Sequence, residues 1–214
     1  MYNSVKSLAL ATGTMAMVFG SIASAHAYTI YTNRAAWQSA VDALGGVTTT
    51  DTFSTDISSA QSITLDSGIV STNAANITLP NAFNNNSVSG GTYKNATGGA
   101  TASTTITWNL PTSVFAFGAD FISTNAGRLT LSGDFDGTGA QTLLVNDTIG
   151  AADGFLGVIG TSSFNSVVFG NNSTLVDAFE IDNASFAVPE PLTMLGVGAA
   201  IGFGGLFRKT KNKQ

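Results

Sequence analysis

In the middle of this chain apolar residues occupy every second position, and this spacing limits the possible folds more than any other feature. Ile106, Trp108 and Leu110 alternate with threonine and asparagine, and the same period continues through residues 115–121 and 129–135. Successive side chains of a β-strand point to opposite faces, so each such segment has one face that must be buried. Shorter segments of the same kind lie at residues 63–65, 77–79, 143–145, 155–159, 167–169 and 179–186.

About ten such strands, joined by turns rich in Gly, Asn, Asp and Ser, predict two antiparallel sheets packed face to face. Only 10% of the residues are charged and 24 are glycines, which fits neither a helical bundle nor a charged disordered chain. No repeat of constant period is visible, which disfavours a β-helix or a propeller. We therefore expect an all-β domain over residues 28–187, a jelly-roll-like antiparallel β-sandwich.

One short amphipathic helix is expected before the strands. It is predicted over residues 32–44, where four apolar side chains fall at i, i+3, i+4 and i+7: Trp37, Ala40, Val41 and Leu44. Thr32 or Asn33 can cap its start, and Gly45-Gly46 can end it. We expect Trp37 to anchor this helix onto a sheet rather than to serve as a platform for a sugar.

The segment 81–102 is polar and rich in glycine, and it is predicted to be the longest loop. Phe83 and Tyr93 are its candidate ligand-binding residues, because their rings can stack on a sugar. The alternative is that both rings pack back onto the sandwich.

The residue types present argue against most kinds of catalysis. The chain has no Cys, and its one His, His26, lies outside the predicted domain. This argues against thiol and Ser-His nucleophiles, disulfides and His-ligated metals in residues 28–187. Glycoside hydrolysis needs two carboxyl groups about 5–9 Å apart, and no aromatic-walled motif surrounds Glu180. We expect a protein that is not an enzyme.

The predicted domain is acidic. Residues 28–187 contain three Lys and Arg against twelve Asp and Glu, hence a net charge of −9. Such a surface repels nucleic acids and anionic membranes, and it tolerates divalent cations.

Three aspartates are candidate Ca²⁺ ligands. Asp134 and Asp136 lie at i and i+2 beside a glycine turn, where carboxylate and carbonyl oxygens can gather. Position 145 is Val145, so the bidentate Glu of an EF-hand is missing, and a plain hairpin turn is the alternative. Asp182 shares strand parity with Phe186, which predicts an inward carboxylate that needs a cation, an arginine or backbone donors.

The two ends of the chain are predicted to be targeting segments. Lys6, the apolar stretch 8–23 and Ala25-His26-Ala27 have the order of a secretory signal, which places the mature start at Tyr28. At the other end, a proline-containing motif precedes sixteen mostly apolar residues, 192–207, and a basic cluster. We expect these residues to form a single transmembrane helix, although a helix of that length spans about 24 Å, slightly less than a hydrocarbon core of about 30 Å. A core helix at the first end and an ordinary membrane anchor at the second are the alternatives.

The C-terminal residues 188–214 resemble the PEP-CTERM sorting signal of Gram-negative bacteria. The resemblance rests on Pro189-Glu190-Pro191, the glycine-rich apolar segment and the cluster that begins with Arg208 and Lys209. It implies recognition by an exosortase, which removes or transfers such tails, usually in organisms that make exopolysaccharide. The inner membrane would hold the precursor transiently through the apolar segment.

The body also resembles a secreted domain that recurs in PEP-CTERM proteins, a lectin-like sandwich of unassigned activity. The resemblance rests on four segments: residues 33–37, 51–53, 154–157 and 179–183. In such carbohydrate-binding sandwiches an Ile-Asp-Asn final strand often holds a Ca²⁺ ligand, which again points to Asp182. We expect an exported protein of the cell envelope or matrix that binds polysaccharide. The alternatives are a structural surface or biofilm protein without a specific ligand and, less favoured, a glycoside hydrolase.

Overall fold

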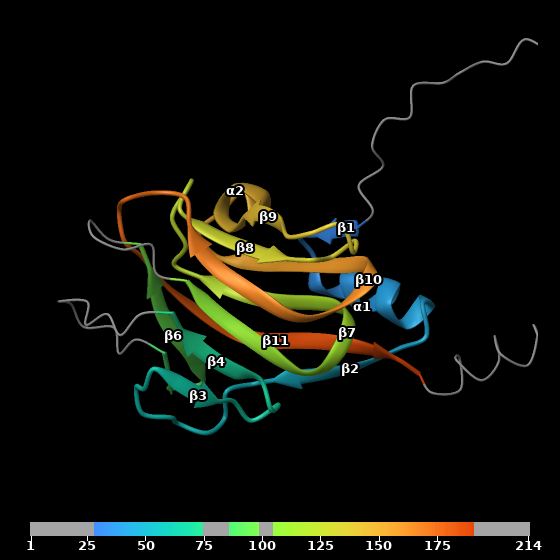
Figure 1. The fold of residues 1–214 in the computed structure, drawn as a ribbon, viewed down its shortest axis with the longest axis horizontal. Coiled ribbons are helices and arrows are strands. Elements are labelled where there is room, and N and C mark those ends of the chain that lie inside the picture. Colours follow the sequence, from blue (N-terminus) through green and yellow to red (C-terminus); the bar gives the residue numbers. More distant parts are fainter. Residues whose placement is uncertain (1–27, 75–85, 99–104, 191–214) are drawn as a thin grey trace, which may run out of the picture.

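The computed structural model describes residues 28–74, 86–98 and 105–190 (Figure 1). Within them the strands are β1 (Tyr28–Tyr31), β2 (Gly46–Asp51), β3 (Ser62–Thr64), β4 (Val70–Asn73), β5 (Ser87–Ser89), β6 (Thr92–Thr97), β7 (Ile106–Ile122), β8 (Leu129–Gly133), β9 (Gln141–Leu144), β10 (Gly154–Asn171) and β11 (Asp177–Pro189). The helices are α1 (Arg34–Ala43) and α2 (Val145–Ile149). The prediction of a mostly β, antiparallel domain is confirmed.

All eleven strands belong to one hydrogen-bonded sheet, whereas the sequence predicted two sheets packed face to face. The difference arises in β7 and β10, each of which joins two segments that the alternation pattern separates. Residues 106–109 of β7 pair with β4 and the second half of β10, and residues 116–122 pair with β11 and the first half of β10. The register shifts between these halves, where the exposed Pro111 lies, as is usual for proline at bulges.

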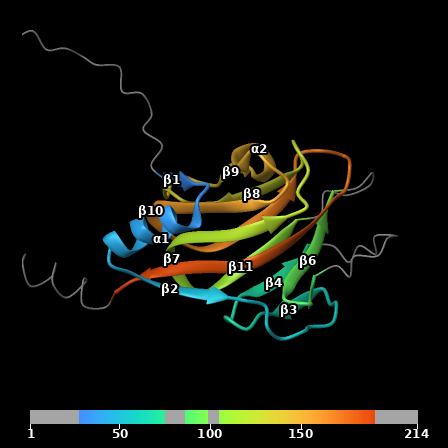
Figure 2. The ribbon, with the colours of Figure 1, turned by 180° about the vertical axis from the view of Figure 1, so that it is seen from behind.

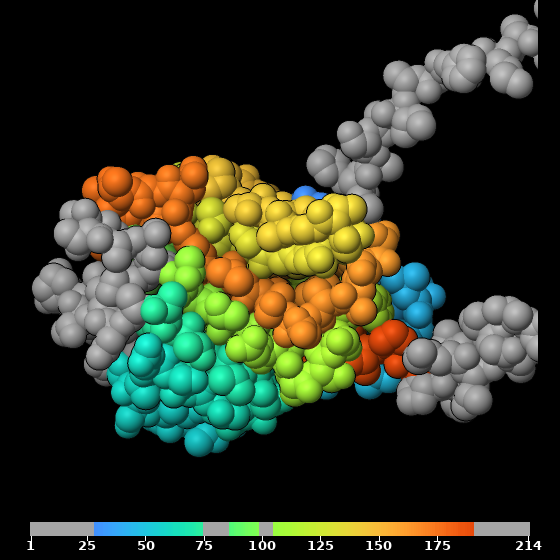
Figure 3. Space-filling view, viewed as in Figure 1, coloured from blue at the N-terminus to red at the C-terminus, as the bar shows by residue number. Residues whose placement is uncertain are grey.

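The two long strands bend so that their halves face each other. Nine residues of straight strand would separate Trp108 from Phe117 by about 30 Å, yet the centres of their rings lie 6.1 Å apart. One layer therefore has the order β3-β4-β7-β10-β8-β9. The other has the order β5-β6-β11-β7-β10-β1, and β2 pairs with the same edge of β11 as β6. Strands β7 and β10 contribute one half to each layer. The layers are seen in Figures 1 and 2, and Figure 3 shows the outer surface of the first.

Aromatic side chains fill the space between the layers. Trp108 makes edge contacts with Tyr93 and Phe169, at 5.0 Å between ring centres in each case. Phe169 in turn contacts Phe121 and Phe179. These rings are at most 1% exposed, so most of the alternating residues that the sequence placed on one face do form the core. Phe115 is the exception in β7, because it is half-buried and packs with the cluster under α1.

Helix α1 covers the outer face of the second layer, beside β1 and β10 (Figure 2). The predicted helix is confirmed: Asn33 is the N-cap, its Oδ1 accepts from the amide of Ala36 at 2.9 Å, and Trp37 is buried. Leu44, predicted on the apolar stripe, is 56% exposed because the helix ends before it.

Two local predictions were wrong. Within the segment predicted as one long loop, residues 87–97 contain strands β5 and β6, which pair with each other, and β6 also pairs with β11. Val145, predicted in a strand, begins the short helix α2. The segments 1–27, 75–85, 99–104 and 191–214 lie outside the described residues, and with them the predicted signal peptide and the apolar C-terminal segment. No helix within the described ranges is long and apolar enough to cross a bilayer.

Candidate functional site

The best-built polar site lies beside α1 and rests on two glycines. Gly118 of β7 and Gly157 of β10 are register partners on the face that α1 covers. A Cβ on Gly118 would lie 2.6 Å from Cζ of Phe155, and one on Gly157 would lie 2.5 Å from Cδ1 of Trp37. Only hydrogen at these positions lets the two rings settle on the sheet, with their centres 5.8 Å apart.

Arg34, the first residue of α1, lies on this aromatic base. Its guanidinium carbon is 4.7 Å from the centre of the Phe155 ring, in cation–π geometry. Nη2 donates to Oδ2 of Asp120 at 3.0 Å, and Nε donates to the same oxygen at 3.2 Å. Nη1 donates to Oγ of Ser185 at 2.9 Å, and Nη2 also donates to the carbonyl of Asn183. The planar donor fork of arginine is thereby fixed on three strand residues.

A bulge in β11 positions Asn183 and Ser185. The pairing of β11 with β7 shifts between Asp182 and Ser185, and Asn183 has a φ of 48°. Ile181 faces the core before the bulge, and Ala184 faces it afterwards. The side chains that point inward are therefore at odd-numbered positions before the bulge and at even-numbered positions after it. The prediction that Asp182 points into the core is therefore wrong. Asp182 is half-buried on the α1 side, where it is the register partner of Asp120.

A groove of about 590 Å³ opens beside this network. Its lining residues come from α1 and three strands: Arg34, Ala35, Gln38, Thr50, Asp120 and Asn183. Nε2 of Gln38 is held by Oγ1 of Thr48 at 2.9 Å and Oδ1 of Asp42 at 2.7 Å, and the hydroxyls of Thr50 and Ser185 lie 2.9 Å apart. The volume is in the range of small-ligand sites, and the lining offers carboxylate, amide and hydroxyl groups on rigid elements.

Two of the four segments that carry the resemblance of the body contribute residues to this groove, and a third lies beneath its Arg34. Residues 33–37 begin α1, residues 154–157 supply Phe155 and Gly157 beneath it, and residues 179–183 end at Asn183. In the fourth segment, residues 51–53, the carboxylate of Asp51 accepts from the amides of Phe53 and Ser67, both at 2.8 Å. These hydrogen bonds fix the chain after β2.

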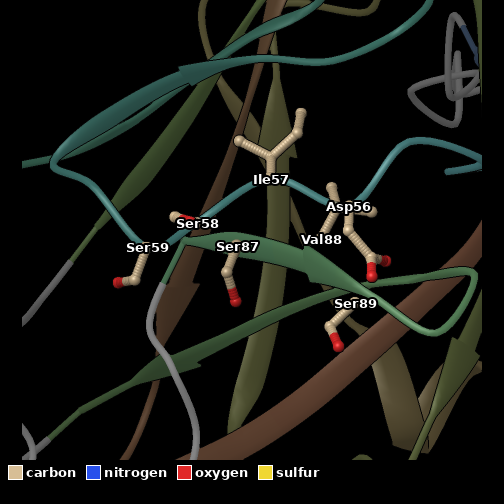
Figure 4. A pocket seen from close by; sticks show the side chains of 7 residues that line it. All are labelled: Asp56, Ile57, Ser58, Ser59, Ser87, Val88 and Ser89. Atoms are coloured by element: carbon tan, nitrogen blue, oxygen red, sulfur yellow. The ribbon is translucent and has the colours of Figure 1, made fainter.

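A second, smaller hollow of about 230 Å³ lies between β5 and residues 56–59 (Figure 4). The backbones of Ile57 and Val88 pair there, and Asp56 accepts from the amide of Gly90 at 3.0 Å. Figure 4 shows the side chains of Ser87 and Ser89 on the same side of β5. Among the residues that the structure describes, no cationic side chain lines this hollow, so it offers fewer kinds of polar contact than the groove beside α1.

Within the described residues, the three predicted Ca²⁺ ligands do not form one metal-binding cluster. Asp136 accepts from the amide and hydroxyl of Thr138, at 2.9 and 2.7 Å, and these hydrogen bonds lower the pKa of its carboxyl group. Asp134 accepts from the amide of Gly139 at 3.1 Å, so both carboxylates close the β8–β9 turn. Asp182 lies on β11, and the described residues contain no cluster of three acidic side chains that could hold a metal ion.

Tyr93 is a core residue and cannot present its ring to a ligand. It is 0% exposed, and its hydroxyl contacts Ser71 at 2.9 Å and Oδ1 of Asn86 at 3.1 Å. Burial raises the pKa of the Tyr93 phenol, although hydrogen bonds with Ser71 and Asn95 oppose the increase. Phe83, the other candidate, lies outside the described residues.

The predicted sorting motif begins within the sheet. Pro189 is the last residue of β11 and pairs with Gly46, and the amide of Glu190 donates to the carbonyl of Gly45 at 2.8 Å. Pro191, Arg208 and Lys209 lie outside the described residues.

The pairing of the groove residues Arg34 and Asp120 was not predicted from the sequence. One signal was available: Asp120 is the only charged residue in the seventeen residues of β7. Arg34 is likewise one of only three Lys or Arg between positions 28 and 187. Comparisons with protein-family models, curated proteins and solved structures found no match.

Proposed function

We propose that this chain is an exported protein of the cell envelope or extracellular matrix whose tail is processed by an exosortase. The order of the two end segments supports this proposal: a leader ending in Ala25-His26-Ala27 and a tail that joins Pro189-Glu190-Pro191 to an apolar stretch and basic residues. The inner membrane holds the precursor transiently, and the folded domain acts outside the cytoplasm.

Within that function, the groove beside α1 is the proposed carbohydrate-binding site. Sugar hydroxyls both donate and accept hydrogen bonds, and the lining supplies the carboxylate of Asp120, the amides of Gln38 and Asn183 and the hydroxyl of Thr50. This set of hydrogen-bonding groups in the groove is the main support for the proposed carbohydrate binding. The fold serves as a jelly-roll-like scaffold that holds these groups on strands and a helix.

Neutral sugars are the preferred class of ligand. Arg34 is already paired with Asp120, Lys94 lies 3.6 Å from Glu180, and Arg128 donates to the carbonyl of Val176. With two of its three cations in ion pairs and a net charge of −9, the domain repels polymers rich in uronic acids or phosphate.

The test measures binding of protein purified from its producing cells to the exopolysaccharide of the same cells, with dextran and alginate as neutral and acidic probes. We expect retention on the native polymer, weaker or no retention on alginate, and at least a tenfold loss for Asp120→Asn. Asp134→Asn is the matched control, because it makes the same chemical change on an exposed turn, and Asp134 does not line the groove. No retention on any glycan would refute the binding part.

The alternative is a purely structural surface protein. It predicts no saturable ligand but a changed matrix or flocculation after deletion of the gene. A glycoside hydrolase is less favoured, because Asp120 is held by Arg34 and its neighbour Asp182 does not line the groove. Release of reducing ends from the bound polymer would favour the hydrolase instead.

A further inference from the structure

The end of the folded domain is held in the sheet from both sides. Residues 185–187 of β11 lie between β7 and β2. Val188 and Pro189 then continue the pairing with β2 alone, and the amide of Glu190 makes the last bond, to Gly45. The backbone is thus hydrogen-bonded up to the middle of the Pro189-Glu190-Pro191 motif.

The partner of this last stretch is itself rigid. Gly45 has a φ of 67°, which other residues adopt only with strain. A Cβ on Gly46 would lie 2.6 Å from Cγ1 of Val41 and 2.7 Å from Cζ of Phe115, so the turn from α1 into β2 is tightly packed. We call the β2–β11 pairing from residues 45–47 to residues 188–190 the terminal clasp.

The terminal clasp restricts what a protease can reach. A protein that recognises an extended peptide does so through main-chain hydrogen bonds, so residues on both sides of the target bond must first leave their own sheet. Ala187 is 0% exposed and Phe186 is 4% exposed, so withdrawing them would also expose core surface. The exposed Pro189 and Glu190 can be contacted by their side chains while their backbone stays paired.

We propose that the terminal clasp sets the boundary of tail processing: bonds up to Pro189–Glu190 are protected in the folded protein, and the tail is removed beyond Glu190. In hydrolysis the C–N bond breaks, the acyl carbon gains the hydroxyl of a water molecule, and the released amine gains the proton. The retained chain then ends at Glu190 or later. That an exosortase performs this step rests on the proposed function, whereas the boundary is a property of the fold.

The experiment is limited proteolysis of the full chain, purified in mild detergent, with a protease of broad specificity and mass determination of the fragments. We expect a stable product whose C-terminus is Glu190 or a later residue. A main product ending between residues 184 and 189 would overturn the proposal.

Gly46→Val should loosen the terminal clasp and increase cleavage at residues 187–190 several-fold. Leu44→Ala is the control, because this neighbouring side chain is 56% exposed. If Gly46→Val does not fold, hydrogen exchange of the unchanged chain tests the terminal clasp instead. The amide of Glu190 should exchange at least tenfold more slowly than an unstructured amide, and fast exchange there would refute the terminal clasp.

The two proposals fail in different ways. Protein from the producing cells that keeps its whole tail, combined with an in vitro product ending at or beyond Glu190, would refute exosortase processing and leave the boundary intact. A mature C-terminus before Glu190 in the producing cells would refute the boundary and leave processing intact.

Discussion

Arg34 and Asp120 are separated by 86 residues in the sequence, yet Nη2 of the first lies 3.0 Å from Oδ2 of the second. The contact joins the start of α1 to the outer face of β7 and forms one wall of the groove. Both side chains are about one-third exposed, so water screens their attraction and the pair fixes geometry more than it adds stability.

Arg34→Lys is expected to lose the double contact with Asp120, because an ammonium group lacks the planar fork. We expect a modest loss of stability, about 1 kcal/mol or less, and a clear loss of glycan retention. A double-mutant cycle of Arg34 and Asp120, measured by urea unfolding, checks the coupling. The Lys94–Glu180 pair, with a single contact of 3.6 Å, is the comparison and should couple more weakly. Equal coupling in the two pairs would contradict this interpretation.

Gly157→Ala should destabilise the protein by about 1–3 kcal/mol through overpacking, because the new methyl group meets Trp37 and Phe155. Urea unfolding measures the loss. In a Trp37→Ala background the cost should be smaller, since one of the two obstructing rings is gone and the Phe155 ring can move into the space that Trp37 leaves. If the free-energy costs of Gly157→Ala and Trp37→Ala simply add in the double variant, the new methyl group does not clash with the Trp37 ring.

Asp177→Ala should be among the more damaging single changes, with a loss of about 3 kcal/mol or more. The carboxylate is 0% exposed and accepts from the side chain and amide of Asn125, at 2.6 and 3.1 Å, and from the amide of Leu129 at 3.1 Å. Asp177→Asn should cost less, because one acceptor oxygen remains. Asp153→Ala, which removes one exposed acceptor for the amide of Ser123, is the control and should cost less than about 1 kcal/mol. A chemical-denaturation midpoint for Asp177→Ala close to that of Asp153→Ala would refute this role.

The turn at Asp136 should make stability depend on acid pH. Because its pKa is lowered in the folded state, its contribution is complete above the ordinary value of 3.8 and is lost as the pH falls through the lower, folded-state pKa. Asp136→Asn should therefore differ most from the unchanged protein above about pH 5 and least near pH 2. Thr138→Val, which removes one of the donors, should show a smaller difference of the same sign. Thermal unfolding across this pH range provides the measurement, and a difference that grows toward low pH would contradict it.

Features that depend on neighbouring residues were predictable from the sequence. Asn33 and the apolar spacing of Trp37 and Val41 specified α1, because capping and helical periodicity act within a few residues. The alternation around Trp108 and Phe117 specified strands with one buried face for the same reason.

Features that depend on distant partners needed the tertiary structure. The bends of β7 and β10 are made where the pairing between these two strands shifts. Pro111 lies within that shift, but the pairing of the distant strands sets where the shift begins and ends. Tyr93 lies in a polar, glycine-rich segment, but pairing with β11 brings it under Trp108.

The sequence by itself determined the class of secondary structure, the start of the helix and the acidic, cysteine-free character of the domain, because these follow from local sterics and composition. The tertiary structure alone decided that a single extra residue near Asn183 reverses the face of Asp182, and that Arg34 meets Asp120. A one-residue register shift moves every following side chain to the opposite face, and the register is chosen by the packing of the whole sheet.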